Sequence, residues 1–429
     1  MPSSSHSLDR VSVTFDDDHA VADAGLILPA TLGRRLGLEQ ATDALVGVGY
    51  RPGRKAATVV HAILAGADCI DDLDILRTGA TQRVLGHTAM APSTVGTWLR
   101  SMTFGHVRQL DRLAETLLGR AWAAGAGPGD AAMTIDLDST VCQVHGYAKQ
   151  GAAYGYTRQY GYHPILATRA DTGEVLHTRM RKGSANTARG SQRFVRETIG
   201  RVRRAGATGP LTLRADSGFW SNKVIAACTD HDVRYSITVR QTRQVRAAID
   251  GIDEAAWTDI DYTAGGHAQV AETTLAGRRL VVRRTRLTGQ QAQLWPDWRH
   301  HAFVTDRTGD AVDLDADHRH HAVVELAIRD LKAGAGLNHC PSGVFNANAA
   351  WLVLAALAHN LLRWTTTLGG IHTGPVVAKT IRRRYLTIPG RITRSARRTT
   401  LHLPTRWPWR DAFTEALSRL RHVTIPQPC

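Results

Sequence analysis

A short apolar strand that ends in acids and hydroxyls, residues 134–140, limits the fold of this chain more than any other stretch. Successive side chains of a strand point to opposite faces of a sheet, so Asp136 and Asp138 share one face. The apolar side chains between them face the other way, which is the arrangement that a metal-dependent site on a sheet needs. An acidic strand edge or an Asp-capped turn gives the same sequence, and alternation does not choose between the two acids.

The hydrophobic period changes once along the chain, at the Gly- and Pro-rich residues 125–129. Before this break, apolar side chains recur at three- and four-residue spacing, which predicts helices over residues 30–124. After it, strands alternate with helices, which predicts a mixed α/β sheet. The predicted strands cover residues 134–140, 162–169, 174–180, 211–216, 234–240 and 302–306, and the predicted helices cover residues 187–205, 222–229, 317–334 and 351–367.

The same patterns predict a division of the chain into successive segments. Within the helical segment, Ser93 is the predicted N-cap of a helix, and with residues 83–86 it gives a helix–turn–helix-like outline that any small bundle can also produce. The predicted segments are an N-terminal tail (1–29, disordered to about Arg10), a helical DNA-binding domain (30–128), the first part of the sheet domain (129–242), a β-rich insertion (243–300), the second part of the sheet domain (301–370) and a basic C-terminal region (371–429).

The charge of the chain favours a polyanionic partner. The formal net charge is +15 and the isoelectric point about 10.1. From residue 371 onward there are eleven Arg and one Lys against Asp411 and Glu415, so 12 − 2 = +10 of that charge lies in the last seventh of the chain. A basic footprint confined to one region predicts binding to nucleic acid.

The composition also limits where the protein acts. No stretch is expected to span a membrane, and residues 1–5 lack the basic-then-apolar pattern of a secretory signal. Five dispersed cysteines without CxxC spacing suit a reducing cytosol and argue against a disulfide framework. We therefore expect a cytoplasmic protein with no membrane partner.

Three acids stand where a sheet-based site would gather carboxylates. Asp138 and Asp216 each follow a predicted strand, and Glu325 lies on a predicted helix. Carboxylates delivered by two adjacent strands and one helix can bind two divalent metals, Mg²⁺ or Mn²⁺. Such a pair activates a water or a 3′-hydroxyl for phosphoryl transfer.

Two basic residues follow the third acid on the same helix. Arg329 and Lys332 lie four and seven residues after Glu325, so all three share one helix face. A carboxylate followed by bases can hold a metal while the bases hold the flanking phosphates. An ordinary surface pair has the same spacing, so this helix alone leaves both interpretations open.

These motifs resemble those of a known family. Residues 138–140 (Asp-Ser-Thr), residues 214–219 (Arg-Ala-Asp-Ser-Gly-Phe) and Glu325 with Lys332 resemble the three signature motifs of bacterial insertion-sequence DDE transposases, which have an RNase H-like catalytic core. Residues 151–156 and 161–164 resemble the sequence between the first two acids. The likeness is greatest to the cut-and-paste group called "thirteen-eighty" and extends from about Leu45 to residues 406–409.

The resemblance implies roles for the motif residues. Asp138, Asp216 and Glu325 would form a catalytic triad that binds two Mg²⁺ (or Mn²⁺) ions. The motif selects Asp138 over Asp136, which leaves Asp136 as a supporting neighbour of the site. Lys332 would contact DNA phosphate near the cleaved strand.

The third motif departs from the family pattern. Relatives carry a Tyr seven residues and an Arg four residues before the Glu, where this chain has His318 and His321. Either these histidines contact phosphate, or His320, Arg319 or Arg329 does so, or this copy is weakened. The histidine spacing matches no standard zinc module.

The remaining implied contacts are with DNA. In relatives a Trp of the β-rich insertion stacks on a flipped base, and Trp298, Trp295 and Trp257 are candidates, although an aromatic there can equally be insertion core. The residues expected to contact DNA are Lys332, Arg329, His318, His321, Arg158, Trp298, Arg382, Arg383 and Arg384.

The resemblance implies a DNA transposase that cleaves terminal inverted repeats and joins the 3′-hydroxyl ends to target DNA. Because two ends must be held together, a homodimer on double-stranded DNA is expected. The alternatives are an RNase H-like nuclease without strand transfer and a catalytically weakened, transposase-derived DNA-binding protein.

Overall fold

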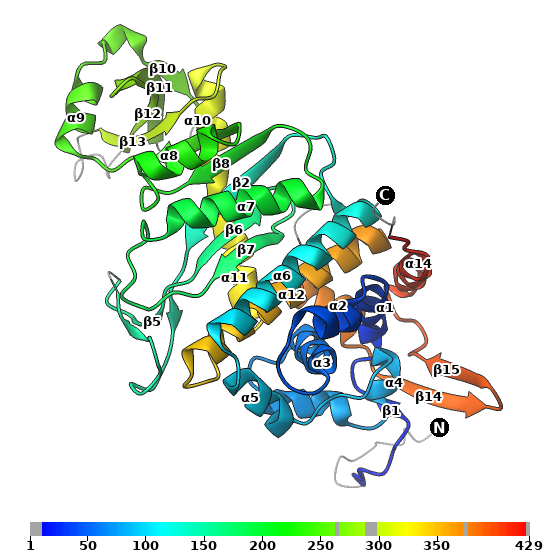
Figure 1. Cartoon of the computed structure of the whole chain (residues 1–429). Helices are drawn as coiled ribbons and strands as arrows, with labels where there is room; N and C mark the ends of the chain where they lie inside the picture. The colour runs from blue at the N-terminus through cyan, green and yellow to red at the C-terminus, as the bar shows by residue number, and fades with distance from the viewer. Residues whose placement is uncertain (1–10, 156, 262–265, 288–297, 372–375, 426–429) are drawn as a thin grey trace.

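The structure is a computed structural model that describes residues 11–155, 157–261, 266–287, 298–371 and 376–425. The predicted disorder before about Arg10 and the candidate Trp295 lie outside these residues. Figure 1 shows an elongated molecule with helices at one end, a large sheet in the middle and the insertion at the other end.

A mixed nine-stranded sheet runs through the middle of the molecule, in the order β10-β11-β12-β13-β9-β8-β2-β6-β7. The central strand β2 is antiparallel to β6 and parallel to β8, which is in turn parallel to β9. An antiparallel trio followed by two parallel strands is the RNase H-like arrangement, so the predicted fold class is confirmed. The core strands are β2 (Met133–Ser139), β6 (Ile165–Arg169), β7 (Val175–Arg179), β8 (Leu211–Ala215) and β9 (Val233–Thr238).

The β-rich insertion continues this sheet instead of forming a separate one. Its last strand, β13 (Arg299–Thr305), pairs antiparallel with β9, and Phe303 lies opposite Thr238. A small apolar cluster of Val270, Val281, Phe303 and Leu314 forms its core. The other elements are α9 (Arg243–Asp250), a helix that the sequence did not predict, and β10 (Thr258–Ile260), β11 (Gly266–Leu275) and β12 (Arg278–Leu287).

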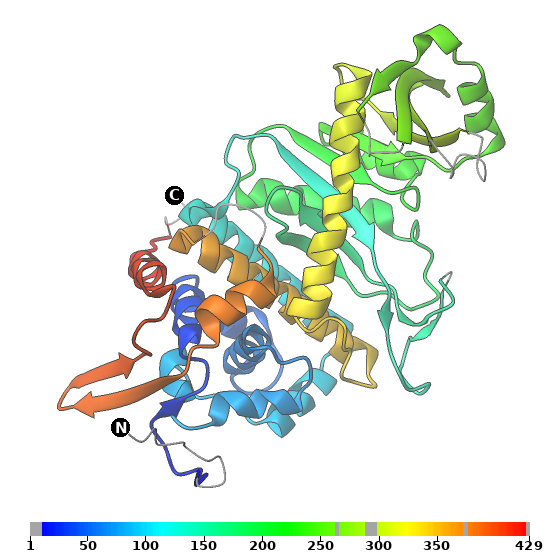
Figure 2. The ribbon, with the colours of Figure 1, turned by 180° about the vertical axis from the view of Figure 1, so that it is seen from behind.

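Helices cover both faces of the sheet. Helices α7 (Ser191–Ala205) and α8 (Asn222–Thr229) lie in front of it in Figure 1. On the opposite face, Figure 2 shows one long helical rod that crosses the strands. It consists of α10 (Ala311–Arg319), a 3-10 turn (His320–Ala322) and α11 (Val323–Gly334), so the helix predicted at 317–334 begins earlier and is broken once.

The N-terminal helices pack around one long apolar helix, α12 (Phe345–Gly369). By length and composition α12 could cross a membrane, so the expectation that no stretch qualifies was wrong, but 89% of its most apolar window is buried inside the protein. The N-terminal helices are α1 (Ile27–Arg35), α2 (Leu38–Leu45), α3 (Pro52–Ala65), α4 (Thr81–Leu85), α5 (Pro92–Arg100) and α6 (Phe104–Ala121).

The predicted cap of α5 was wrong by two residues. The N-cap is Ala91, no side chain caps the helix, and Pro92 occupies the first turn. Proline is favoured there because its fixed φ suits a helix and its missing N–H leaves no unsatisfied donor. Ser93 is exposed one residue further along.

The C-terminal region is folded and consists of distinct elements. Helix α14 (Arg410–Arg421) packs against α12 and α1, with Phe413, Ala416 and Leu420 buried. Before it, β14 (Gly390–Ser395) and β15 (Arg398–His402) form a hairpin that projects from the helical end in both views. A short strand, β1 (Ala20–Val21), pairs with the base of β14.

Candidate active site

The sheet and the long helical rod bring the three motif acids to one place. Asp138 lies near the end of β2, and Asp216 follows β8, the parallel neighbour whose Ala215 pairs with Leu137. Glu325 lies in the first turn of α11, which contacts β2. Asp138 and Asp216 are partly buried, and Glu325 is exposed.

The charges of these acids affect one another. Burial, together with repulsion from Asp216 and Glu325, raises the pKa of Asp138 to about 6, although the Ser139 amide and His321 oppose the shift. The raised pKa of Asp138 thus reflects burial first and the neighbouring carboxylates second. Because the donors are all carboxylate oxygens, the set fits a divalent cation of the Mg²⁺ or Mn²⁺ type.

The turn after Asp216 depends on a glycine. The Gly218 amide donates to Asp216 Oδ1 at 3.0 Å and so holds the carboxylate in place. A Cβ at residue 218 would come within 2.7 Å of Thr187 Cγ2 and 3.1 Å of Asp216 Oδ1. Glycine therefore allows the chain to turn closely against this acid.

Asp136, on the same strand as Asp138, is engaged within the protein. Arg214 on β8 donates from Nε and Nη2 to its two carboxylate oxygens at 2.8 and 2.9 Å, and His321 Nδ1 donates to Oδ1 at 2.9 Å. Burial alone would raise the pKa of Asp136, but these hydrogen bonds outweigh it and hold the pKa below its usual range. Arg214 also donates to the Asp317 carbonyl and therefore connects two core strands to the rod that carries Glu325.

Both ring nitrogens of His318, a residue of α10, have hydrogen-bond partners within the protein. They are hydrogen-bonded with Ser236 Oγ at 2.7 Å and Thr238 Oγ1 at 2.9 Å, and the ring stacks on Phe303. Burial and the nearby positive charge of His321 lower the pKa of His318 to about 3. Both ring nitrogens are thus engaged within the protein, and the expected DNA contact of His318 stays a prediction. His318 fastens α10 to β9 and β13.

The other residues that were predicted to contact DNA differ in whether their side chains already have partners within the protein. Lys332 Nζ donates to the Val141 carbonyl at 2.9 Å, so it reaches the segment just past β2. Arg329 and Arg158 are exposed. His321 uses Nδ1 for Asp136, which gives it a supporting role that the sequence did not suggest.

In the insertion, two tryptophans enclose a buried arginine. The Arg284 guanidinium lies 4.2 Å from the ring centre of Trp257 and 4.4 Å from that of Trp298. It also donates to Gln269 Oε1 at 2.7 Å and to Glu254. Trp298 is only partly buried, and the Arg286 guanidinium lies 4.6 Å from its ring centre.

Among the basic residues after α12, Arg382 has a structural role. Its Nε donates to the Leu64 carbonyl at 2.9 Å, and its Nη2 donates to the Ile63 and Gly334 carbonyls at 3.0 and 2.7 Å. It thereby donates to carbonyls in the last turns of α3 and α11, of which the Ile63 carbonyl also accepts from the Gly66 amide. The guanidinium of Arg382 is thus engaged within the protein, and its expected DNA contact stays a prediction. Arg383 is exposed, and Arg384 lies against Trp409.

Arg382→Gln is expected to lower the free energy of unfolding by about 2 kcal/mol, because charged hydrogen bonds to three carbonyls are lost. Arg383→Gln removes the same charge from an exposed neighbour and should change stability by less than about 0.5 kcal/mol. Thermal melting of the two variants beside the wild type measures the difference. An unchanged melting temperature together with weakened DNA binding in Arg382→Gln would instead support the predicted DNA contact of Arg382.

Two residues that support the acids were missed by sequence reasoning. Arg214 lies in the second motif, residues 214–219. Its position opposite Asp136 in the parallel pairing of β2 with β8 could have predicted their ion pair. His163 is buried and hydrogen-bonded with Ser139 Oγ at 3.0 Å and with the Ala185 carbonyl at 2.8 Å. It therefore holds the residue next to Asp138, and nothing in its local sequence indicated this contact.

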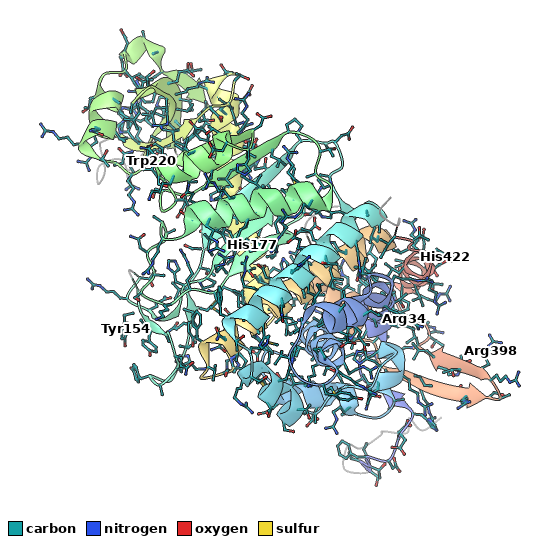
Figure 3. All side chains as sticks on the ribbon, viewed as in Figure 1. Arg34, Tyr154, His177, Trp220, Arg398 and His422 are labelled. Carbon is teal, nitrogen blue, oxygen red and sulfur yellow. The ribbon has the colours of Figure 1, made fainter. Side chains whose placement is uncertain are left out.

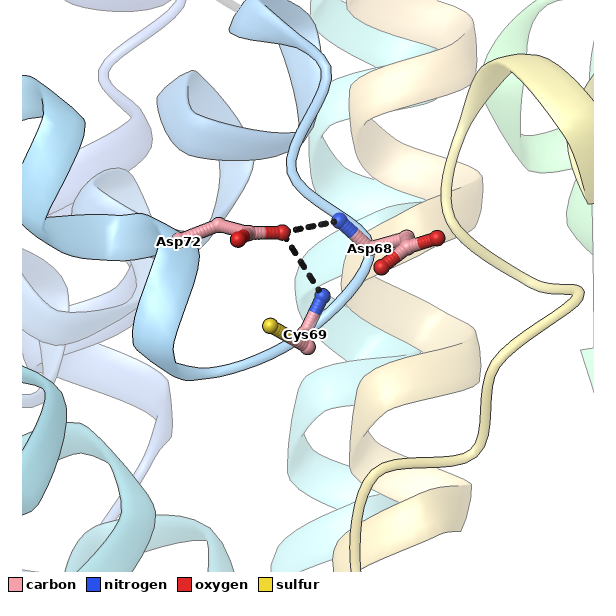
Figure 4. Close-up of side chains that lie close together, drawn as sticks. All are labelled: Asp68, Cys69 and Asp72. Carbon is pink, nitrogen blue, oxygen red and sulfur yellow. Dashed lines mark hydrogen bonds between the residues drawn. The ribbon is translucent and has the colours of Figure 1, made fainter. Parts of the chain in front are cut away.

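Another acidic cluster lies away from the sheet. Within the described residues, Asp68, Cys69 and Asp72 bring potential ligand atoms to within 4.8 Å of one another (Figure 4). Asp72 Oδ2, however, accepts from the Asp68 and Cys69 amides at 3.1 and 3.3 Å. The cluster is thus explained as a turn in which an acid caps backbone amides.

The RNase H-like sheet with its gathered carboxylates defines a DDE-type protein that processes nucleic acid. A family model described as "Transposase DDE domain group 1" matches residues 3–425, and the chain belongs to this family. No curated protein matches the chain. Among solved structures, it is similar to the piggyBac transposase in a synaptic complex with hairpin DNA, at 10% identity and a TM-score of 0.46, over 85% of this chain and 80% of that one.

Proposed function

We propose that the protein is a cut-and-paste transposase of a bacterial insertion sequence, acting in the cytoplasm. It would cleave DNA at terminal inverted repeats and join the 3′-hydroxyl ends to target DNA. The observation that carries the proposal is the convergence of Asp138, Asp216 and Glu325 at the end of β2, where β8 pairs with β2 and α11 contacts it. Membership of the transposase family supports the same activity in general.

The roles of the residues follow from their positions. Asp138, Asp216 and Glu325 would hold two divalent cations, which when bound activate the attacking oxygen and stabilise the leaving one. The Asp136–Arg214 pair would fix β2 against β8 and thus set the spacing of the first two acids. Lys332, bonded just past β2, would place its positive charge beside the phosphate of the bound strand.

DNA recognition would use the exposed basic residues, and two copies of the chain would hold the two ends together. Arg329, Arg158 and Arg383 are exposed and available for phosphate. Trp298 could stack on an unpaired base through its accessible part, with Trp257 on the other side of Arg284 as its support. His321, one of the family departures, would act through Asp136 in addition to any phosphate contact.

Purified full-length protein should cut duplexes made from the DNA on either side of its coding sequence, and should do so only with Mg²⁺ or Mn²⁺. Asp216→Ala should lower the cleavage rate by about 10³-fold or more, since several kcal/mol of transition-state stabilisation are lost. Denaturing gels of end-labelled duplexes measure this rate. Cleavage that persists in EDTA would overturn the metal-dependent mechanism.

The same preparation separates the alternatives. Pre-cut ends with free 3′-hydroxyls, mixed with a plasmid target, should give strand-transfer products. Cleavage without transfer would identify a nuclease. Specific end binding without cleavage in Mn²⁺ would identify a catalytically weakened DNA-binding protein.

A further inference from the structure

The β14–β15 hairpin is a projecting element that the catalytic site does not use. Its base is fixed by the pairing of Ala20 with Arg391 and by Ile392, which is buried with Val21 and Val84. Beyond that base, the strands stand away from the helical end of the molecule in both views (Figures 1 and 2). A ribbon with so little of its length packed against the protein is available to a partner.

The hairpin is strongly and uniformly basic. The sequence contains no Asp or Glu between Asp330 and Asp411, and four arginines lie in or between the two strands. All four are exposed, and Figure 3 shows Arg398 on the projecting ribbon. Within the described residues, their ion pair is that of Arg391 with Asp17, at 3.7 Å near the base. The arginines of the hairpin are Arg391, Arg394, Arg397 and Arg398.

Both faces of the ribbon carry phosphate-binding groups. Side chains alternate along each strand, and Ser395 pairs with Arg398 while Arg394 pairs with Thr399, so each face near the tip has a guanidinium beside a hydroxyl. Arginine, serine and threonine side chains are common ligands of DNA phosphate oxygens. Ala396 is the only apolar residue of the tip (residues 395–398), and a single methyl group offers little surface that a protein or membrane partner would bury.

The shape of the ribbon fits one polyanion in particular. The major groove of B-form DNA admits a two-stranded β-ribbon, and its walls are lined with phosphates. We propose that the β14–β15 hairpin is a DNA-binding arm that enters a groove of the duplex and grips its backbone. The proposal rests on the proposed function for the kind of DNA, but it requires only binding and no cleavage.

The arm lies far from the insertion, at the opposite end of the molecule (Figure 1). It therefore extends the contact with the duplex beyond the acids without entering their site. Its arginines should raise affinity through counterion release, which makes binding steeply dependent on salt. They should change the cleavage rate of fully bound DNA very little.

The test is a salt titration of the full-length protein in EDTA, with fluorescence anisotropy of the coding-sequence flanking duplex. In Arg394→Gln/Arg397→Gln/Arg398→Gln, the slope of log K against log salt should fall by about 2 to 3, or about 0.9 for each lost phosphate contact. Affinity at moderate salt should fall by about tenfold or more. Exposed glutamines in place of arginines leave the fold intact, which circular dichroism checks.

The matched control removes the same charge from α7. Arg193, Arg196 and Arg204 are paired with Glu197, Asp230 and Glu115, so their replacement by Gln lowers the net charge equally without removing free guanidinium groups. Its slope should equal that of the wild type. An unchanged slope in the hairpin variant, or an equal fall in the control, would overturn the proposal. Binding that depends on the arm but is not followed by cleavage once Mg²⁺ or Mn²⁺ replaces the EDTA would support the DNA-binding arm and reject the proposed transposase activity.

Discussion

Asp138→Asn is expected to abolish DNA cleavage and, at the same time, to stabilise the metal-free protein above pH 6. The folded protein raises the pKa of this carboxyl from 3.8 to about 6, first through burial and then through repulsion from Asp216 and Glu325. The folded state therefore binds the proton more tightly than the unfolded state, and the wild type loses stability as the pH rises from about 4 through 6. Asparagine cannot ionise and avoids this loss.

The expected gain is about 3 kcal/mol at pH 8, because the pKa rises by about two units and each unit corresponds to about 1.4 kcal/mol. Thermal melting at pH 4 and pH 8 in EDTA measures it, and the difference between wild type and variant should appear only at the higher pH. Added Mg²⁺ should stabilise the wild type and leave the variant nearly unchanged, since ligands that bind only the folded state raise its stability. A variant that melts below the wild type at pH 8 would contradict the account.

Asp136→Ala is expected to have the opposite effect on stability, although it lies two residues away on the same strand. Its carboxylate is buried against Arg214, which is itself buried, and its pKa is depressed. Removal of Asp136 leaves the buried guanidinium with only the Asp317 carboxylate, whose Oδ1 lies 3.4 Å from Nη1, at a cost of about 3 kcal/mol. From the sequence, Asp136 was predicted only as a supporting neighbour of the site.

A double replacement separates the charge from the packing. In Asp136→Leu/Arg214→Met neither charge remains, and the loss of stability should be much smaller than the sum of the two single changes, because buried ion pairs are often replaced by apolar side chains at little cost. Urea unfolding of the four proteins of the cycle measures the coupling. Additive losses would show that the two side chains act independently. Cleavage should remain low in the double variant, since Arg214 also binds the Asp317 carbonyl.

Strand and helix order predicted a mixed α/β sheet, and the resemblance of the three motifs to a known family implied its RNase H-like form and a common site for Asp138, Asp216 and Glu325. The motifs are local signals, and each acid stands at the end of an element that its own sequence specifies. Asp136 was predicted as a neighbour, but its bond to Arg214 depends on the register between two strands that are far apart in the sequence.

For His318 and Arg382, the contacts in the structure differ from the predicted DNA contacts for one physical reason. His318 and Arg382 carry the groups that bind phosphate, and composition alone cannot show whether those groups are already occupied. Three carbonyls from distant helices occupy Arg382, and two hydroxyls on β9 occupy His318. For α5 the difference is one of helix boundary: Ser93 was predicted as the N-cap, although Pro92 already begins the helix.

Helix α12 has a consequence for the order in which the chain folds. Its apolar surface is shared by α1, α3, α5 and α6, which are made first, while α12 itself is made near the end of synthesis. Those early helices therefore leave the ribosome with their apolar sides uncovered and must wait for a distant partner. Long-range closure of this kind is slow and prone to aggregation, so we expect production of the protein to depend on chaperones that hold the N-terminal helices until α12 arrives.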